Sequence, residues 1–166
     1  MGRWGGGELT FSSDADAMVV VEDSADPEAN AKATRIVTRL RELLRRPGPD
    51  PALDLDLDLR PEGKGGPMVR SVASSLAYYE KWSATWEAQA LLRASHGAGD
   101  PTVSATLLAG VAPLRYPVDG LDARQVADIR KLKARMESER VPRGTDPRRH
   151  VKLGPGGLSD VEWTVQ

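Results

Sequence analysis

The most regular pattern in this sequence is the run at residues 53–59, in which leucine and aspartate alternate without interruption. Successive side chains of a β-strand point to opposite faces, so strict alternation predicts a strand with leucines on one face and aspartates on the other. The aspartate face alone is most simply a solvated sheet face. However, like charges on one sheet face repel each other, and a nearby cation would relieve that repulsion.

A second acidic motif lies near the start of the chain. Residues 13–16 read Ser-Asp-Ala-Asp, between a glycine turn at residues 5–7 and a short apolar run at residues 17–21 that predicts a buried strand. Glycines can present bare backbone N–H groups to phosphate oxygens. Asp14 and Asp16, two residues apart on a strand, share a face and suit hard cations such as Mg²⁺. A carboxylate from the leucine–aspartate strand could complete a three-aspartate site; the alternative is a loop with a charged strand end.

Two basic segments are further candidates for phosphate binding. The loop at residues 60–67 follows the leucine–aspartate strand, and its Arg60 and Lys64 could neutralise a triphosphate as charge moves onto a leaving pyrophosphate. Lys152 precedes a glycine turn and a helix start, which suits phosphate at a helix N-terminus. From spacing alone, a surface turn and a tight turn between helices explain these segments better.

Helical periodicity marks three segments. Apolar residues recur at helical spacing over residues 30–46, with Asp26 as the expected cap and Pro27 in the first turn. Residues 69–94 predict one long helix, and residues 122–139 predict another. The first helix also has a basic face, which we expect to meet water, formed by Arg35, Arg39, Arg41 and Arg45.

The remaining segments carry weaker patterns. The glycine-rich residues 1–13 predict a turn or loop, and the irregular segment after the long helix contains a possible strand at residues 103–108. Residues 152–166 predict a glycine loop that enters a helix. Trp82 and Trp86, four residues apart, are expected to pack in the core or between domains.

Composition narrows the class of protein. The chain has 166 residues, 23 Lys and Arg against 24 Asp and Glu, and no cysteine. The balanced charge does not favour a nucleic-acid surface, and the absence of cysteine excludes disulfides and thiolate metal sites. With no apolar stretch of about 20 residues and no signal peptide, we expect a soluble, cytoplasmic protein without a membrane partner. Both ends interrupt a pattern, which predicts a fragment of a longer polypeptide.

Several motifs occur together and in order along the chain. They are Met1-Gly2-Arg3-Trp4-Gly5-Gly6, Ser13-Asp14-Ala15-Asp16, Leu59-Arg60-Pro61-Glu62-Gly63, Tyr78-Tyr79, Trp82, the run from Trp86 to Ala94 and the run from Lys152 to Gln166. In this order, the chain resembles the glutamine synthetase adenylyltransferases, also called glutamate–ammonia ligase adenylyltransferases. The set is specific because it is ordered over nearly the whole chain.

The resemblance implies a fold class and a metal site. The fold would be α+β, with a nucleotidyltransferase-fold mixed sheet and flanking helices over residues 1–120, followed over residues 121–166 by the start of an all-helical domain. Asp14 and Asp16 become the metal-binding pair. The family's spacing to the Leu-Arg-Pro motif points to Asp56 as the third carboxylate.

The resemblance also implies a cofactor and a nucleotide. Mg²⁺ would be the cofactor and ATP a substrate. Gly5, Gly6 and Ser13 would cradle the triphosphate, and the expected nucleotide-binding set is completed by Arg60, Lys64 and Lys152.

The implied reaction transfers AMP from Mg-ATP to a tyrosine hydroxyl of glutamine synthetase, which would regulate nitrogen assimilation. The family has two related halves, one adding AMP and one removing it by phosphorolysis, and the Ile129–Arg135 run with the earlier motifs looks most like the adding, C-terminal half of actinobacterial members. The removing half, an inactive truncated fragment and a regulatory nucleotide-binding module are the alternatives. Glutamine synthetase is the expected partner, and the signalling protein PII another through the longer parent.

The chain also departs from the family pattern. Family members have an apolar strand before the position of Met1, and their helical domain continues well beyond the position of Gln166. Activity of the isolated chain is therefore not implied by the motifs alone.

Overall fold

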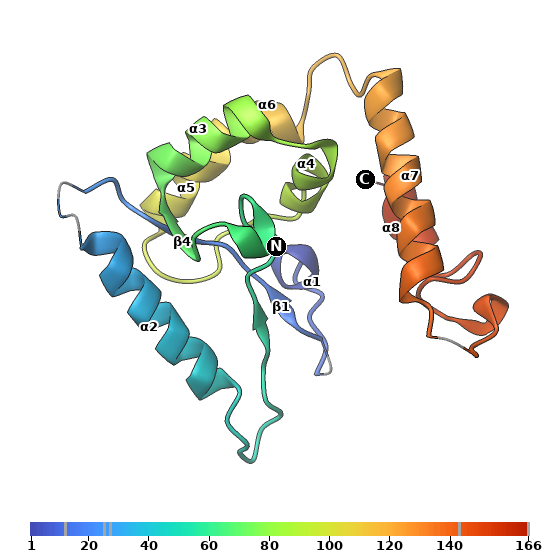
Figure 1. Ribbon diagram of the computed structural model, residues 1–166, viewed down its shortest axis with the longest axis horizontal. Helices are drawn as coiled ribbons and strands as arrows, with labels where there is room; N and C mark the ends of the chain where they lie inside the picture. The colour runs from blue at the N-terminus through green and yellow to red at the C-terminus, as the bar shows by residue number, and fades with distance from the viewer. Residues whose placement is uncertain (12, 25, 27, 143, 166) are drawn as a thin grey trace. The chain divides into compact units, whose positions relative to one another are not determined.

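The computed structural model describes residues 1–11, 13–24, 26, 28–142 and 144–165, and the chain divides into two compact units (Figure 1). The first unit, Met1–Val118, contains α1 (Gly2–Gly5), β1 (Ala15–Asp16), β2 (Val19–Val21), α2 (Ala29–Leu44), β3 (Leu55–Asp56), the 3₁₀ turn η1 (Gly63–Gly65), β4 (Val69–Ser71), α3 (Val72–Trp82), α4 (Thr85–Leu91), α5 (Pro101–Gly110) and α6 (Ala112–Arg115). The second, Asp119–Gln166, contains α7 (Ala123–Arg140), the 3₁₀ turn η2 (Pro147–Arg149) and α8 (Leu158–Val165).

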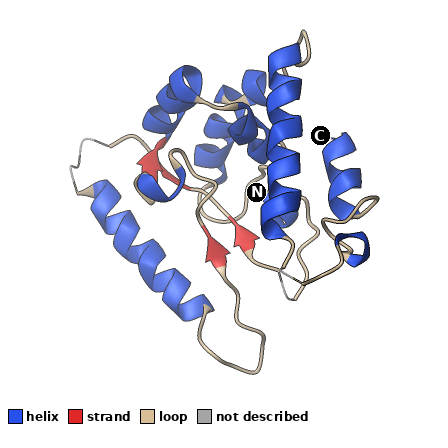
Figure 2. Ribbon diagram, turned by 45° about the vertical axis from the view of Figure 1, so that its right-hand side comes forward, coloured by secondary structure: helices blue, strands red, loops and turns tan. Residues whose placement is uncertain are grey.

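The strands of the first unit form two parallel pairs, β1 with β3 and β2 with β4. Parallel strands need a crossover connection, and α2 lies on the chain between the members of each pair. Figure 2 shows short strands among predominantly helical structure. The mixture of helices and strands agrees with the expected α+β class. Among the described residues both pairings are parallel, so the antiparallel pairing of a mixed sheet is not seen there.

The leucine–aspartate alternation is confirmed by burial. Leu55 and Leu57 are buried in a cluster with Val37 of α2 and Val69 of β4, while the aspartates project from the opposite face. The hydrogen-bonded strand is shorter than expected because a turn follows at once: the carbonyl of Leu57 accepts from the backbone N–H of Arg60 at 3.3 Å. The run therefore forms one short strand, and its leucines and aspartates lie on the faces that the alternation predicted.

The helix predicted over residues 30–46 is confirmed as α2: Val37 and Leu44 of its apolar stripe pack in the core, and three of its four arginines are exposed. Arg41 Nε donates to the carbonyl of Leu55 at 3.0 Å, and Arg45 Nε donates to Asp54 at 3.0 Å. Part of the basic face therefore contacts the β3 segment, while Ile36, on the apolar stripe, remains 68% exposed. Apolar spacing therefore predicted the core-facing side of α2 but not the contacts of Arg41 and Arg45 with the β3 segment.

The start of α2 also differs from the prediction. The residue that caps the helix is Glu28, whereas Asp26 accepts from the backbone N–H of Glu28 at 2.9 Å and from Lys32 Nζ at 2.8 Å. Asp26 thus fixes the turn before the helix. Pro27, expected in the first turn, lies outside the described residues.

The single long helix predicted over residues 69–94 is wrong. The first three residues form β4, which pairs with β2, and the helical part is broken between α3 and α4. Ser71 caps α3 by accepting from the N–H of Ser74, and Glu87 accepts from the N–H of Ala84 at 2.9 Å at the start of α4. Trp82 is 66% exposed, so the core role expected for it is not seen within this unit.

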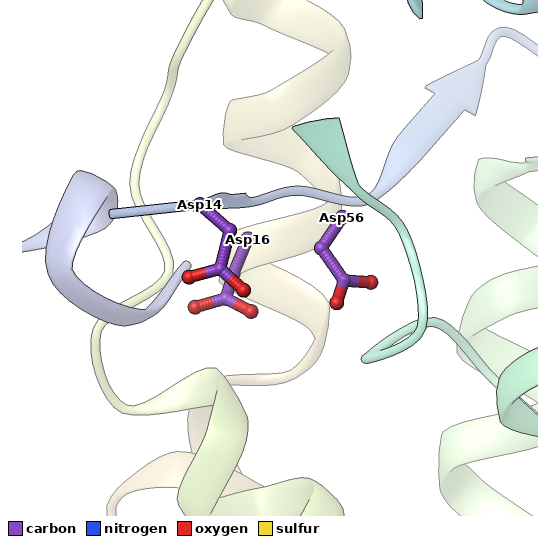
Figure 3. Close-up of side chains that lie close together, drawn as sticks. All are labelled: Asp14, Asp16 and Asp56. Carbon is purple, nitrogen blue, oxygen red and sulfur yellow. The ribbon is translucent and has the colours of Figure 1, made fainter. Parts of the chain in front are cut away.

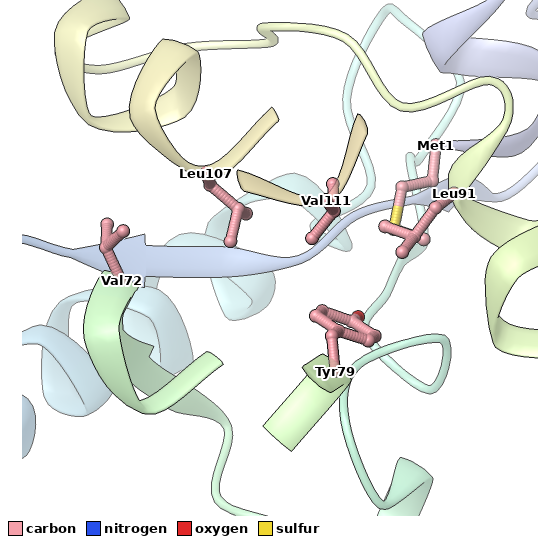
Figure 4. Packing of buried hydrophobic residues seen from close by; sticks show 6 residues of the cluster. All are labelled: Met1, Val72, Tyr79, Leu91, Leu107 and Val111. Atoms are coloured by element: carbon pink, nitrogen blue, oxygen red, sulfur yellow. The ribbon is translucent and has the colours of Figure 1, made fainter. Parts of the chain in front are cut away.

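The strand predicted at residues 103–108 is also wrong, since these residues belong to α5. Asp100 accepts from the N–H of Thr102 at 2.8 Å, and Pro101 occupies the first turn, a combination that starts helices. The helix packs on α3, and Leu107 joins the main core cluster, shown in Figure 4 with Met1, Val72, Tyr79, Leu91 and Val111.

The glycine-rich start is partly helical: residues 2–5 form the single turn α1, where a loop was predicted. The helix predicted over residues 122–139 is confirmed as α7, with Asp122 and Gln125 bonded reciprocally at its start. The predicted glycine loop and helix at the end of the chain are confirmed as a turn followed by α8. No helix among the described residues combines the length and apolar character needed to cross a membrane.

Candidate metal centre

Three aspartates converge at the β1–β3 pairing. The parallel register sets Ala15 opposite Leu55 and Asp16 opposite Asp56, through hydrogen bonds of 2.8 Å on either side. Asp14, two residues before Asp16, points to the same side of the strand (Figure 3). One carboxylate oxygen of each aspartate lies within 4.8 Å of the others. The two acidic motifs predicted to combine are therefore adjacent in space.

The other two aspartates of the alternating run have basic partners. Asp54 pairs with Arg45 at 2.5 Å. Asp58 lies 3.2 Å from Lys64 Nζ and 3.6 Å from Arg60. These ion pairs relieve part of the repulsion along the strand, and Asp56 is the member of the run that joins the cluster.

The carboxylate of Asp56 is held by the backbone that follows it. Its Oδ1 accepts from the N–H of Asp58 at 2.7 Å. Asp14 is exposed, whereas Asp16 and Asp56 are half-buried. The cluster therefore lies at the surface, open on the side of Asp14.

Gly2 is part of this site although the sequence patterns did not single it out. Its φ is +50°, and a Cβ placed there would lie 2.1 Å from Oδ2 of Asp16. An L side chain at this position would be strained and would displace the carboxylate. The signal in the sequence was the first glycine of the motif Met1-Gly2-Arg3-Trp4, which was read only as part of the family pattern.

The predicted phosphate cradle has a different local role. The N–H groups of Gly5 and Gly6 donate to the carbonyls of Met1 and Gly2 at 2.7 and 3.2 Å, so they are used inside the turn. Gly5 packs so closely on the backbone of Arg93 that a Cβ would lie 1.9 Å from its carbonyl oxygen. Ser13 shares a hydrogen bond of 2.8 Å with Thr10.

The three basic residues predicted to bind phosphate differ in exposure and in the unit to which they belong. Arg60 is only 11% exposed, and its guanidinium is engaged by the loop that follows β3. Lys64 is 84% exposed and contacts Asp58, within the same loop. Lys152 belongs to the second unit, where its carbonyl accepts from the N–H of Ser159 at 2.9 Å.

The first unit also contains a cavity of about 420 Å³. It is lined mainly by apolar side chains along residues 17–20, with contributions from α1, α2 and α5, and by the loop at residues 94–100. Of the residues predicted to bind nucleotide or metal, Gly5 lines it and the three aspartates do not. The acidic cluster is thus not part of the cavity lining, although Ala17 and Leu55, adjacent in sequence to Asp16 and Asp56, are.

The cluster fits a hard divalent cation. All its donors are carboxylate oxygens, the ligand type that Mg²⁺ prefers. The ligand oxygens lie up to 4.8 Å apart, slightly more than the roughly 3–4 Å between two oxygens on one Mg²⁺ ion. Three carboxylates at this spacing repel one another, so a bound cation would stabilise the arrangement.

Comparisons with known proteins identify the family. The sequence model of glutamate-ammonia ligase adenylyltransferase matches residues 1–110. Three similar proteins, each named bifunctional glutamine synthetase adenylyltransferase/adenylyl-removing enzyme, come from Cutibacterium acnes (65% identical over 166 residues), Streptomyces coelicolor (54% over 169) and Mycobacterium tuberculosis (53% over 169).

These alignments cover 100% of this chain but 17% of each relative, so the chain spans about a sixth of their length. The family match covers more than half of the chain and includes all three clustered aspartates. The chain therefore belongs to the glutamate–ammonia ligase adenylyltransferase family of nucleotidyltransferases.

Proposed function

We propose that Asp14, Asp16 and Asp56 hold Mg²⁺, and that the chain transfers AMP from ATP to a tyrosine hydroxyl of glutamine synthetase. The convergence of these three carboxylates across the β1–β3 register carries the proposal. The relatives' names supply the transferred group and the acceptor protein for those relatives, and family membership extends both to this chain as a hypothesis.

In the proposed reaction, the tyrosine oxygen attacks the α-phosphorus of ATP, the bond to the bridging oxygen breaks, and pyrophosphate leaves. Asp56 orients the tyrosine hydroxyl or accepts its proton. Asp14 and Asp16 would be the main ligands of the cation. Mg²⁺, when bound, would stabilise the charge on the attacking and leaving oxygens. The open side of the cluster at Asp14 leaves room for a protein substrate.

The proposal includes the wider setting. Residues 1–120 would form a nucleotidyltransferase-fold domain, and residues 121–166 the start of a helical domain. Ser13, Lys64 and Lys152 are the proposed nucleotide contacts; Gly5 and Gly6, whose N–H groups bond within the turn, are not among them. The protein would act in the cytoplasm, with PII as a further proposed partner.

Incubation of the 166-residue chain with Mg²⁺, ATP labelled on the α-phosphate and unmodified glutamine synthetase tests the proposal. We expect label on glutamine synthetase and release of pyrophosphate. Asp14→Asn should abolish the transfer, and Asp54→Asn, on the same strand face but paired with Arg45, should retain most of it. Measurable transfer by wild type that Asp14→Asn does not reduce would reject the proposed site.

The removal of AMP by phosphorolysis is the second candidate, because the relatives' names include an adenylyl-removing activity. Supplying inorganic phosphate and adenylylated glutamine synthetase, without ATP, separates the two reactions. Formation of ADP in this mixture alone would assign the removing activity. Binding of Mg-ATP without either reaction would instead fit a regulatory module.

A further inference from the structure

We propose that Arg60 is a positioning residue that holds the third carboxylate, Asp56, in the geometry for metal binding; this inference rests on the proposed metal site. Arg60 was expected to contact a triphosphate. Its guanidinium instead lies inside the loop that follows β3, and the contacts within that loop lead back to Asp56.

The first step is the loop itself. Arg60 donates to the carbonyl of Leu57 at 2.8 Å, to that of Gly66 at 3.1 and 3.2 Å, and to that of Lys64 at 3.3 Å. One planar guanidinium therefore joins the two ends of residues 57–66. A lysine could not make the same set of bonds, because its ammonium is a single point donor at the end of a flexible stem.

The second step joins the loop to the acidic cluster. Arg60 also lies 3.6 Å from the carboxylate of Asp58, whose backbone N–H donates to Oδ1 of Asp56 at 2.7 Å. Arg60 thus fixes the residues on either side of the peptide N–H that orients Asp56. Groups that orient metal ligands in this way change metal affinity by about 10–100-fold when they are removed.

Removal of Arg60 should change the affinity for a dication in opposite directions through its charge and through its loop contacts, which makes the inference testable. Loss of a positive charge beside Asp58, two residues from Asp56, should by itself strengthen the binding of a dication. Loss of the loop clamp should weaken it. Lys64 provides the matched control, since it also contacts Asp58 but makes no side-chain bond to the loop carbonyls in the described contacts.

The experiment is a titration of the 166-residue chain with Mn²⁺ alone, in which electron paramagnetic resonance measures the free and bound Mn²⁺. We expect Arg60→Gln to weaken Mn²⁺ binding at least tenfold and Lys64→Gln to leave it unchanged or tighter. Arg60→Lys should weaken it as well, although its charge is retained. Far-ultraviolet circular dichroism checks the fold, and Arg60→Lys replaces Arg60→Gln if the latter does not fold.

Mn²⁺ binding by folded Arg60 variants that equals or exceeds wild type would overturn the inference. The inference would also be overturned if the Arg60 variants kept Mn²⁺ affinity and lost only the binding of ATP, measured in metal-free buffer. That result would assign Arg60 to phosphate binding. Asp14→Asn separates this failure from failure of the metal site. If Asp14→Asn does not reduce Mn²⁺ affinity, the proposed site itself is wrong.

Discussion

Asp16 and Asp56 lie directly opposite each other where β1 pairs in parallel with β3. Neighbouring strands are about 4.8 Å apart, so this register alone brings two carboxylates from distant parts of the sequence within reach of one cation. Asp14 joins them because strand side chains repeat every second residue. The site therefore depends on strand register, and changes that disturb the register or the carboxylates should have measurable consequences.

Gly2→Ala should disrupt the metal site and also destabilise the fold. The positive φ of Gly2 is unfavourable for alanine, and the added methyl group would collide with Oδ2 of Asp16. We expect a loss of about 1–3 kcal/mol in the free energy of unfolding, measured in urea, and a large loss of Mn²⁺ affinity. Gly7→Ala is the matched control: its φ of +71° brings similar strain, but no atom lies within 4 Å of the new methyl. Equal effects of the two variants on Mn²⁺ affinity would contradict the contact with Asp16.

Glu87→Ala should destabilise the first unit through the break between α3 and α4. Glu87 is 3% exposed, and its Oε2 accepts from the N–H of Ala84 where α4 begins. Removal of this acceptor leaves a donor without its partner, which costs about 1–3 kcal/mol. Thermal and urea unfolding measure the effect, with the exposed Glu80→Ala on α3 as control. If Glu80→Ala and Glu87→Ala unfold alike, the capping role is wrong.

Acid should loosen the second unit through Asp160. Hydrogen bonds from Lys133 and then from the N–H of Gly156 lower the pKa of Asp160. A carboxyl group whose pKa is depressed by folding stabilises the folded state above its unfolded pKa, and this contribution is lost as the pH falls through the folded pKa. Stability, followed by circular dichroism, should therefore decline as the pH falls into and below the ordinary titration range of an aspartate.

Asp160→Asn should reduce this pH dependence. Glu139→Gln, which removes a partner of Arg135 in an exposed pair on α7, serves as control and should leave the acid profile close to that of wild type. An acid profile of Asp160→Asn that superimposes on the wild-type profile would remove Asp160 as its cause.

The sequence predicted the parts of the fold in which periodicity is strong and local. The alternation at residues 53–59 predicted the face that buries Leu55 and Leu57, and apolar spacing identified α2 and α7. Periodicity could not reveal that Val69–Ser71 pairs with β2, because strand pairing is a long-range contact. The cap at Asp100 and Pro101 was available as a start signal for α5, but residues 103–108 were read as a possible strand in an irregular segment.

The candidate site was partly predictable for the same reason. Asp14 and Asp16 follow from spacing, while Asp56 came from the family's pattern, since local sequence does not distinguish it from Asp54 and Asp58. The structure separates these three by their partners: Arg45 for Asp54, and Arg60 with Lys64 for Asp58. The inward orientation of Arg60 could not be read from sequence, because it depends on carbonyls that only the folded loop presents.

The most direct test of the three-aspartate site compares two neighbours on one strand face. Mn²⁺ affinity of the 166-residue chain is measured for wild type, Asp56→Asn and Asp54→Asn. The account predicts that Asp56→Asn loses most of its Mn²⁺ affinity, since its carboxylate belongs to the cluster, and that Asp54→Asn retains it, since Asp54 pairs with Arg45. Equal affinity in the two variants, or a greater loss in Asp54→Asn, would contradict it.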